Sequence, residues 1–70
     1  MNKIEITGGY IRLDALLKFA ALCASGGEAK LRITAGEVLV NGEPCTQRGK
    51  KCRDGDIIGL DGQTIQVKCS

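Results

Sequence analysis

Three segments of the chain alternate apolar and polar residues with a period of two, which predicts short, half-buried strands. The first is KIEIT at residues 3–7, which a pair of glycines ends. Each of the other two segments is predicted to form a hairpin of two strands. Asn41-Gly42 in one and Asp61-Gly62 in the other supply the positive φ angles of a tight turn. The predicted hairpin strands are EVLV and EP around the first turn, and DIIGL and QTIQVKC around the second.

Two segments repeat apolar residues with the period of a helix instead. Between Leu13 and Cys23, the sequence LDALLKFAALC places apolar residues at i, i+3, i+4 and i+7. A second helix is predicted to begin at Ser25, because Ser25 and Glu28 have the S-x-x-E spacing of a capping box. In that motif the serine oxygen accepts from an early backbone N–H, and the glutamate reaches back to the serine N–H. This helix is predicted to reach Gly36, since glycine readily takes the left-handed conformation that ends helices.

The length of 70 residues predicts one domain, spanning residues 1–70, with a small core. No apolar run approaches the roughly 20 residues that cross a bilayer, and the first residues lack the apolar segment of a secretory signal. We therefore expect a cytoplasmic monomer with no membrane partner.

Positive charge is concentrated in residues 44–53, called the basic segment below. It contains four cations and no acid, a local charge of +4 in a chain whose net charge is +2. Such a cluster is either a solvated surface or the contact surface for a polyanion. The chain has only two aromatic residues, and this composition argues against recognition of unpaired bases by aromatic stacking. The four cations are Arg48, Lys50, Lys51 and Arg53.

The sequence offers no recognisable catalytic machinery. Histidine, the residue that most often transfers protons in catalysis, is absent, and there is no nucleophile-elbow sequence. Gly26-Gly27 could be mistaken for a phosphate-binding loop, but the surrounding G-x-x-x-x-G-K-[ST] pattern is missing. We therefore expect a protein that is not an enzyme and has no cofactor.

The four cysteines are interpreted as free thiols, because a cytoplasmic location favours the reduced form. A four-thiolate zinc site is the alternative, but it usually needs a close C-x2-C pair. The nearest pair, Cys45 and Cys52, has six residues between its members. We therefore expect no metal site, and we interpret Cys23 and Cys69 as small core residues.

Four short motifs give the chain a family resemblance: RLDALL, SGGEAK, GEVLVNG and GDII, in this order between residues 11 and 58. They resemble the RNA-binding domain named after ribosomal protein S4, also called the αL motif. Among its members, the chain looks most like the stand-alone bacterial YbcJ-like proteins. The resemblance implies an α+β fold in which two short helices pack on a small, mostly antiparallel sheet of hairpins. It also implies that the second helix and the following hairpin form a surface for structured RNA.

The resemblance further implies which residues contact the RNA backbone, and two positions depart from the usual pattern. Gly26 stands where many members have an arginine, and Arg32 stands where an apolar residue is usual. Arg32 therefore either points at RNA or lies along the edge of the core with its stem buried. The implied RNA-binding residues are Arg12, Ser25, Lys30, Arg48, Lys50, Lys51 and Arg53.

The function expected from these observations is non-catalytic binding of structured RNA, such as ribosomal or transfer RNA. Phosphate contacts by lysine and arginine suffice for A-form RNA, whose deep major groove side chains cannot read. The alternative is an accessory module that binds proteins in a ribosome-associated or RNA-processing complex. Ribosomal or RNA-processing proteins are accordingly a second expected class of partner.

Overall fold

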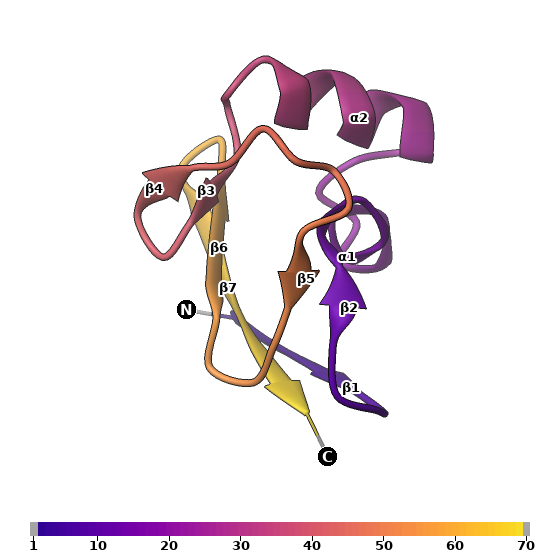
Figure 1. The fold of residues 1–70 in the computed structure, drawn as a ribbon, viewed down its shortest axis with the longest axis vertical. Helices are drawn as coiled ribbons and strands as arrows, with labels where there is room; N and C mark the ends of the chain where they lie inside the picture. Colours follow the sequence, from indigo (N-terminus) through magenta and orange to yellow (C-terminus); the bar gives the residue numbers. More distant parts are fainter. Residues whose placement is uncertain (1, 70) are drawn as a thin grey trace.

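The computed structural model describes residues 2–69, and two helices pack against a five-stranded sheet (Figure 1). The strand order is β1-β7-β6-β3-β4, with β1 and β7 parallel and the other pairs antiparallel. The expected α+β class, with two short helices on a mostly antiparallel sheet, is therefore confirmed. The elements are β1 (Asn2–Ile6), β2 (Ile11–Arg12), α1 (Leu13–Phe19), α2 (Gly26–Thr34), β3 (Leu39–Val40), β4 (Glu43–Pro44), β5 (Lys51–Cys52), β6 (Ile57–Leu60) and β7 (Gln63–Cys69).

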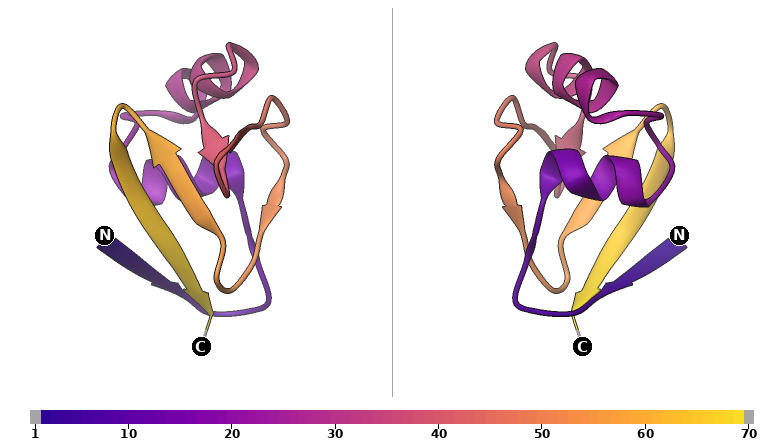
Figure 2. Two further views of the ribbon diagram at one scale, coloured as in Figure 1. Left: turned by 90° about the vertical axis from the view of Figure 1, so that its left-hand side faces the viewer. Right: turned by 90° about the vertical axis from the view of Figure 1, so that its right-hand side faces the viewer.

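One apolar cluster joins the helices to the sheet. In Figure 2, α1 lies across one face of the sheet and α2 lies at one end of the molecule. Leu13, Leu16 and Leu17 of α1 are fully buried, as the helical spacing predicts. On β7, Ile65 and Val67 are buried while their neighbours are more exposed, which is the period of two expected for a strand.

Both predicted hairpin turns are present. Asn41 and Gly42 have φ angles of 53° and 85°, and Asp61 and Gly62 have φ angles of 54° and 77°. Two consecutive residues with positive φ define the type I′ turn, whose twist matches that of the strands. The pairs Val40↔Glu43 and Leu60↔Gln63 close the two turns.

The prediction that the first helix continues to Cys23 is wrong, because α1 ends at Phe19. Ala21 is left-handed, with a φ of 60°. The Ala21 N–H donates to the Lys18 carbonyl (3.1 Å) and the Leu22 N–H to the Leu17 carbonyl (2.9 Å), which is the Schellman pattern of a helix end. Glycine usually occupies this position, so the alanine conceals the end of the helix in the sequence. Cys23 is nevertheless buried, as expected.

The second helix begins as predicted, with one difference in its capping box. Ser25 Oγ accepts a hydrogen bond from the Glu28 N–H (3.2 Å). The Glu28 carboxylate accepts from the Ala24 N–H (2.6 Å) and not from the serine N–H. The helix ends at Thr34, and Gly36 follows it with a φ of 77°. Gly36 therefore terminates the helix without belonging to it.

Two strand pairings have no counterpart in the sequence predictions. The strand expected at residues 3–7 is β1, and it lies parallel to β7 at the edge of the sheet, with Ile4 opposite Val67. Separately, β2 and β5 form a short antiparallel pair, with Arg12 opposite Lys51. Within the described residues, no helix is long and apolar enough to cross a membrane.

Candidate nucleic-acid interface

The pairing of β2 with β5 holds the basic segment against the start of α1 (Figure 1). The Leu13 N–H donates to the Lys50 carbonyl (2.8 Å), and the Asp14 N–H donates to the Arg48 carbonyl (3.1 Å). These bonds satisfy two N–H groups that a helix start otherwise leaves unpaired. Gly49 lies beside the Arg12 guanidinium, since a Cβ atom at position 49 would be 3.8 Å from Arg12 Nη2. The fold thus brings Arg12 together with residues 48–51, although they are far apart in the sequence.

The cations of the basic segment are not neutralised by the protein itself. Among residues 2–69, ion pairs join only Arg12 to Asp14 (3.2 Å) and Arg32 to two acids. The acids that follow the segment are engaged by the backbone instead: Asp54 accepts from the Cys69 N–H (2.9 Å), and Asp56 accepts from the Arg53 N–H (2.8 Å). Four exposed positive charges without a direct ion pair among the described residues therefore face solvent, and two of them, Arg48 and Lys50, lie on backbone that is hydrogen-bonded to α1.

Tyr10 is a member of this surface that the sequence analysis did not identify. Lys51 Nζ lies 5.0 Å and Arg53 Cζ 5.9 Å from the centre of its ring. Residues 51 and 53 point to the same side of the strand, while Cys52 between them points inward and is fully buried. The aromatic face attracts both cations and orients them. Only the β2–β5 pairing brings Tyr10 to this place, so no local sequence signal could have revealed it.

The residues predicted on the second helix lie at different distances from the basic segment. The start of α2 borders a shallow hollow of about 260 Å³, whose lining includes Arg12, Lys18 and Gly26. Ser25, which caps α2, therefore lies next to this surface, and Lys18 is an additional cation there. Lys30 is exposed further along α2, and within residues 2–69 its side chain makes no ion pair with the basic segment.

Arg32 lies at the edge of the core and not on this surface. Its guanidinium binds Asp61 and also Glu37 (Nε to Oε1, 2.9 Å), and its side chain is only 24% exposed. The hydrogen bond that the Arg32 guanidinium donates to Asp61 raises the pKa of Arg32 further above its usual value. Arg32 thus joins α2 to the β6–β7 turn. Of the two positions that the sequence left open, facing RNA or lying along the edge of the core, Arg32 occupies the edge of the core.

The buried cysteines have the character of core residues. Burial, with a smaller contribution from Asp56, raises the pKa of Cys52 from 9.0 to about 11. Burial also raises the pKa of Cys23. Both thiols are therefore protonated at neutral pH, and a thiol is a poor metal ligand. In the part of the chain from residue 2 to residue 69, no three cysteine or acidic side chains are grouped to hold a metal ion.

Comparison with known proteins identifies the class to which this fold and surface belong. A family model described as the S4 domain matches residues 4–68. The chain therefore belongs to the S4 domain family, and the resemblance noted in the sequence is confirmed.

Individual relatives match most of the chain. It is 43% identical over 61 residues to the "Probable ribosome maturation protein RlbA" of Bacillus subtilis, covering 87% of this chain and 86% of that protein. It is 33% identical over 58 residues to the "Putative RNA-binding protein YbcJ" of Escherichia coli, covering 83% of each. The solution structure of E. coli YbcJ, described as revealing an αL motif involved in RNA binding, has a TM-score of 0.74 at 29% identity and covers 97% of this chain and 87% of that chain.

Proposed function

We propose that this protein binds structured RNA of the ribosomal or transfer RNA class without catalysing a reaction. In this proposal residues 1–70 act as one domain and as a monomer in the cytoplasm. The contact surface consists of the basic segment, Arg12 and the start of α2 at Ser25, with Lys30 at its periphery. The observation that carries the proposal is the set of four exposed cations without ion pairs, held on hydrogen-bonded backbone beside Arg12.

Physical reasoning favours RNA as the polyanion. Phosphate contacts dominate nucleic-acid affinity, and cations fixed in position can match the phosphate spacing of a folded RNA. A-form helices are recognised mainly by shape, phosphates and 2′-hydroxyl groups, so a surface poor in aromatic residues is adequate. The names of the relatives, one an RNA-binding protein and one a ribosome maturation protein, support the same class of partner.

The test is the dependence of RNA affinity on salt. Each phosphate contact contributes a slope of about 0.9 in log K against log salt, a duplex DNA value used here as a guide. Four contacts then predict that raising salt from roughly 50 to 200 mM weakens binding on the order of a hundredfold. Titrations of a labelled rRNA fragment and a tRNA by fluorescence anisotropy measure this slope. Replacing Arg48, Lys50, Lys51 and Arg53 with glutamine should remove most of it.

A charge-matched control separates local contacts from net charge. Lys3 and Lys68 are exposed on β1 and β7, and neither makes an ion pair within the described residues. The double variant Lys3→Gln/Lys68→Gln should keep the parental slope, whereas Lys50→Gln/Lys51→Gln should reduce it by about 2. A folded quadruple variant with undiminished affinity and slope would refute the proposal. Binding partners that survive nuclease treatment would favour the protein-interaction alternative.

A further inference from the structure

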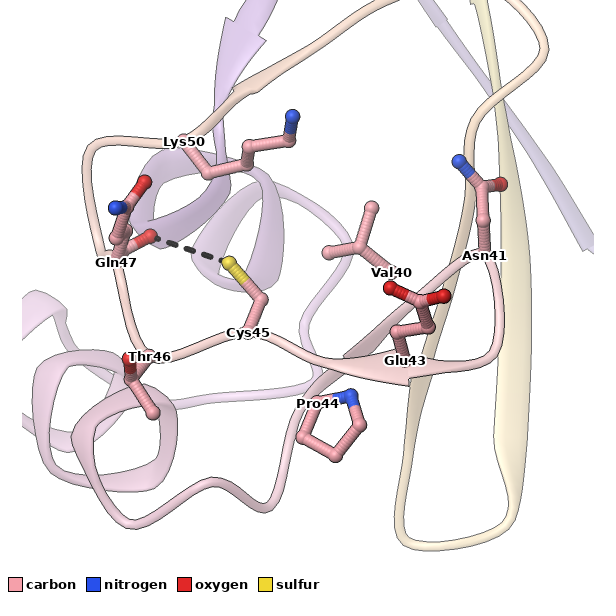
Figure 3. Close-up of a pocket in the computed structure, with 8 residues that line it drawn as sticks. All are labelled: Val40, Asn41, Glu43, Pro44, Cys45, Thr46, Gln47 and Lys50. Atoms are coloured by element: carbon pink, nitrogen blue, oxygen red, sulfur yellow. Dashed lines mark hydrogen bonds between the residues drawn. The ribbon is translucent and has the colours of Figure 1, made fainter.

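A polar hollow opens beside the basic segment, between the β3–β4 hairpin and the chain that leads to β5 (Figure 3). Its volume of about 490 Å³ lies in the range of about 300–1,000 Å³ that is typical of small-ligand sites. Figure 3 shows Glu43 and Lys50 rising from two sides of this hollow, with Val40 between them in this view. Val40 and Pro44 are among the residues that line it, and in Figure 3 the Pro44 ring points to the opposite side of β4 from Glu43.

Both charged groups at the hollow are available to a ligand. Within residues 2–69, neither Glu43 nor Lys50 forms an ion pair, and neither side chain makes a hydrogen bond. The neighbouring amide of Asn41 is already engaged, since it donates to Asp56 (3.1 Å) and accepts from the Ile57 N–H (2.9 Å). The hollow therefore presents one free carboxylate, on the β3–β4 hairpin, and one free ammonium group, on the chain that leads to β5.

A free carboxylate is unfavourable on a surface that attracts phosphates, unless a hydrogen-bond donor of the RNA offsets the repulsion. A carboxylate has two acceptor oxygens, and an unpaired guanine offers two adjacent donors, N1–H and N2–H. The guanine O6 atom, next to N1 on the same edge, accepts a hydrogen bond from lysine. No other RNA base presents two adjacent donors followed by an acceptor on its Watson–Crick edge.

We propose that this hollow binds an unpaired guanine of the RNA, which rests on the proposed RNA-binding function. Glu43 accepts hydrogen bonds from N1–H and N2–H, Lys50 donates one of its three N–H groups to O6, and Val40 contacts the base between them. Phosphate contacts by the basic segment, including Lys50 through its remaining N–H groups, position the RNA, and the hollow adds a base preference. The protein therefore recognises folded RNA that extrudes a guanine next to a helix.

The experiment uses short RNA duplexes that carry a single bulged nucleotide and differ only in that base. Fluorescence anisotropy should show that bulged guanine binds more tightly than adenine, cytosine or uracil, by about 5- to 150-fold. Inosine, which lacks the N2 amino group, should lose part of this preference. 7-Deazaguanine should keep it, because N7 takes no part in the proposed contact.

The variant Glu43→Gln should remove most of the guanine preference and leave the salt slope unchanged. Glu5→Gln, which neutralises an exposed carboxylate on β1, should keep the preference and serves as the matched control. Equal affinities for all four bulged bases with a steep salt slope would overturn this proposal while leaving RNA binding intact. An intact guanine preference in a folded Glu43→Gln protein would also overturn it. Absence of any salt-dependent affinity for these RNAs would refute the underlying function.

Discussion

Replacing Ala21 with glycine should stabilise the protein, although alanine-to-glycine changes normally destabilise helical proteins. Ala21 has a φ of 60° in the turn that ends α1, and its side chain is exposed. An L-residue with a side chain adopts this left-handed conformation at a cost of roughly 1–2 kcal/mol, which glycine avoids. The two hydrogen bonds of the turn involve backbone atoms only, so the substitution retains them.

The net gain is smaller than the strain that is relieved. Glycine also gives the unfolded chain more conformational freedom, which opposes folding by about 0.4–1 kcal/mol. Taken at the middle of each range, the difference predicts a gain of about 0.8 kcal/mol in the free energy of unfolding. For a domain of this size, that corresponds to a rise in melting temperature of roughly 2–8 °C.

Thermal and urea unfolding followed by circular dichroism measure this change. The matched control is Ala15→Gly, because Ala15 is also exposed but lies inside α1. That variant should lose about 0.5–1 kcal/mol. If Ala21→Gly destabilises the protein as much as Ala15→Gly does, the left-handed turn at Ala21 is not present in solution and the reasoning fails.

Three further predictions concern the Ser25 cap of α2, the Cys52 thiol and the effect of a metal chelator. Ser25→Ala should lower the free energy of unfolding by about 0.5–2 kcal/mol, whereas Ser25→Asp, which keeps a capping oxygen, should melt close to the parent. The pKa of Cys52 is raised from 9.0 to about 11 in the folded protein. Its contribution to the free energy of unfolding should therefore be complete below pH 9 and should fall by roughly 3 kcal/mol as the pH rises through 11. The reason is that in this pH range only the unfolded state readily loses the proton. Urea unfolding of the parent and Cys52→Ala tests this, because the variant should lack that component of the decline. A chelator should leave the melting temperature unchanged, and loss of structure with release of stoichiometric zinc would contradict the interpretation of the cysteines.

Local sequence was a good guide wherever a short-range physical rule applies. Asn41-Gly42 predicted its turn because few other residues tolerate two successive positive φ angles. Ser25 predicted the start of α2 because its oxygen reaches an N–H only three residues away. The same reasoning failed at Ala21, which adopts a left-handed conformation that alanine does not prefer.

The candidate site was only partly accessible to such reasoning. The run of cations at residues 48–53 is visible in the sequence, and so is the absence of acids within it. Its geometry is not, because the contacts of this run with Arg12 and Tyr10 depend on β2 and β5 meeting across some 40 residues. Arg32 shows the converse case, since a cation on a predicted helix is already neutralised by Asp61 from a distant turn.

The sequence by itself therefore determined the start of both helices, the two hairpin turns and the net positive character of one segment, since these depend on residues close together in the chain. It did not determine the end of α1 or the pairing of β2 with β5. Tertiary structure alone decided which cations remain unpaired, which carboxylates are free, and that Glu43 and Lys50 share one hollow. The physical reason is that charge compensation depends on distance in space. Only the folded arrangement of the strands sets the distances between groups far apart in the sequence.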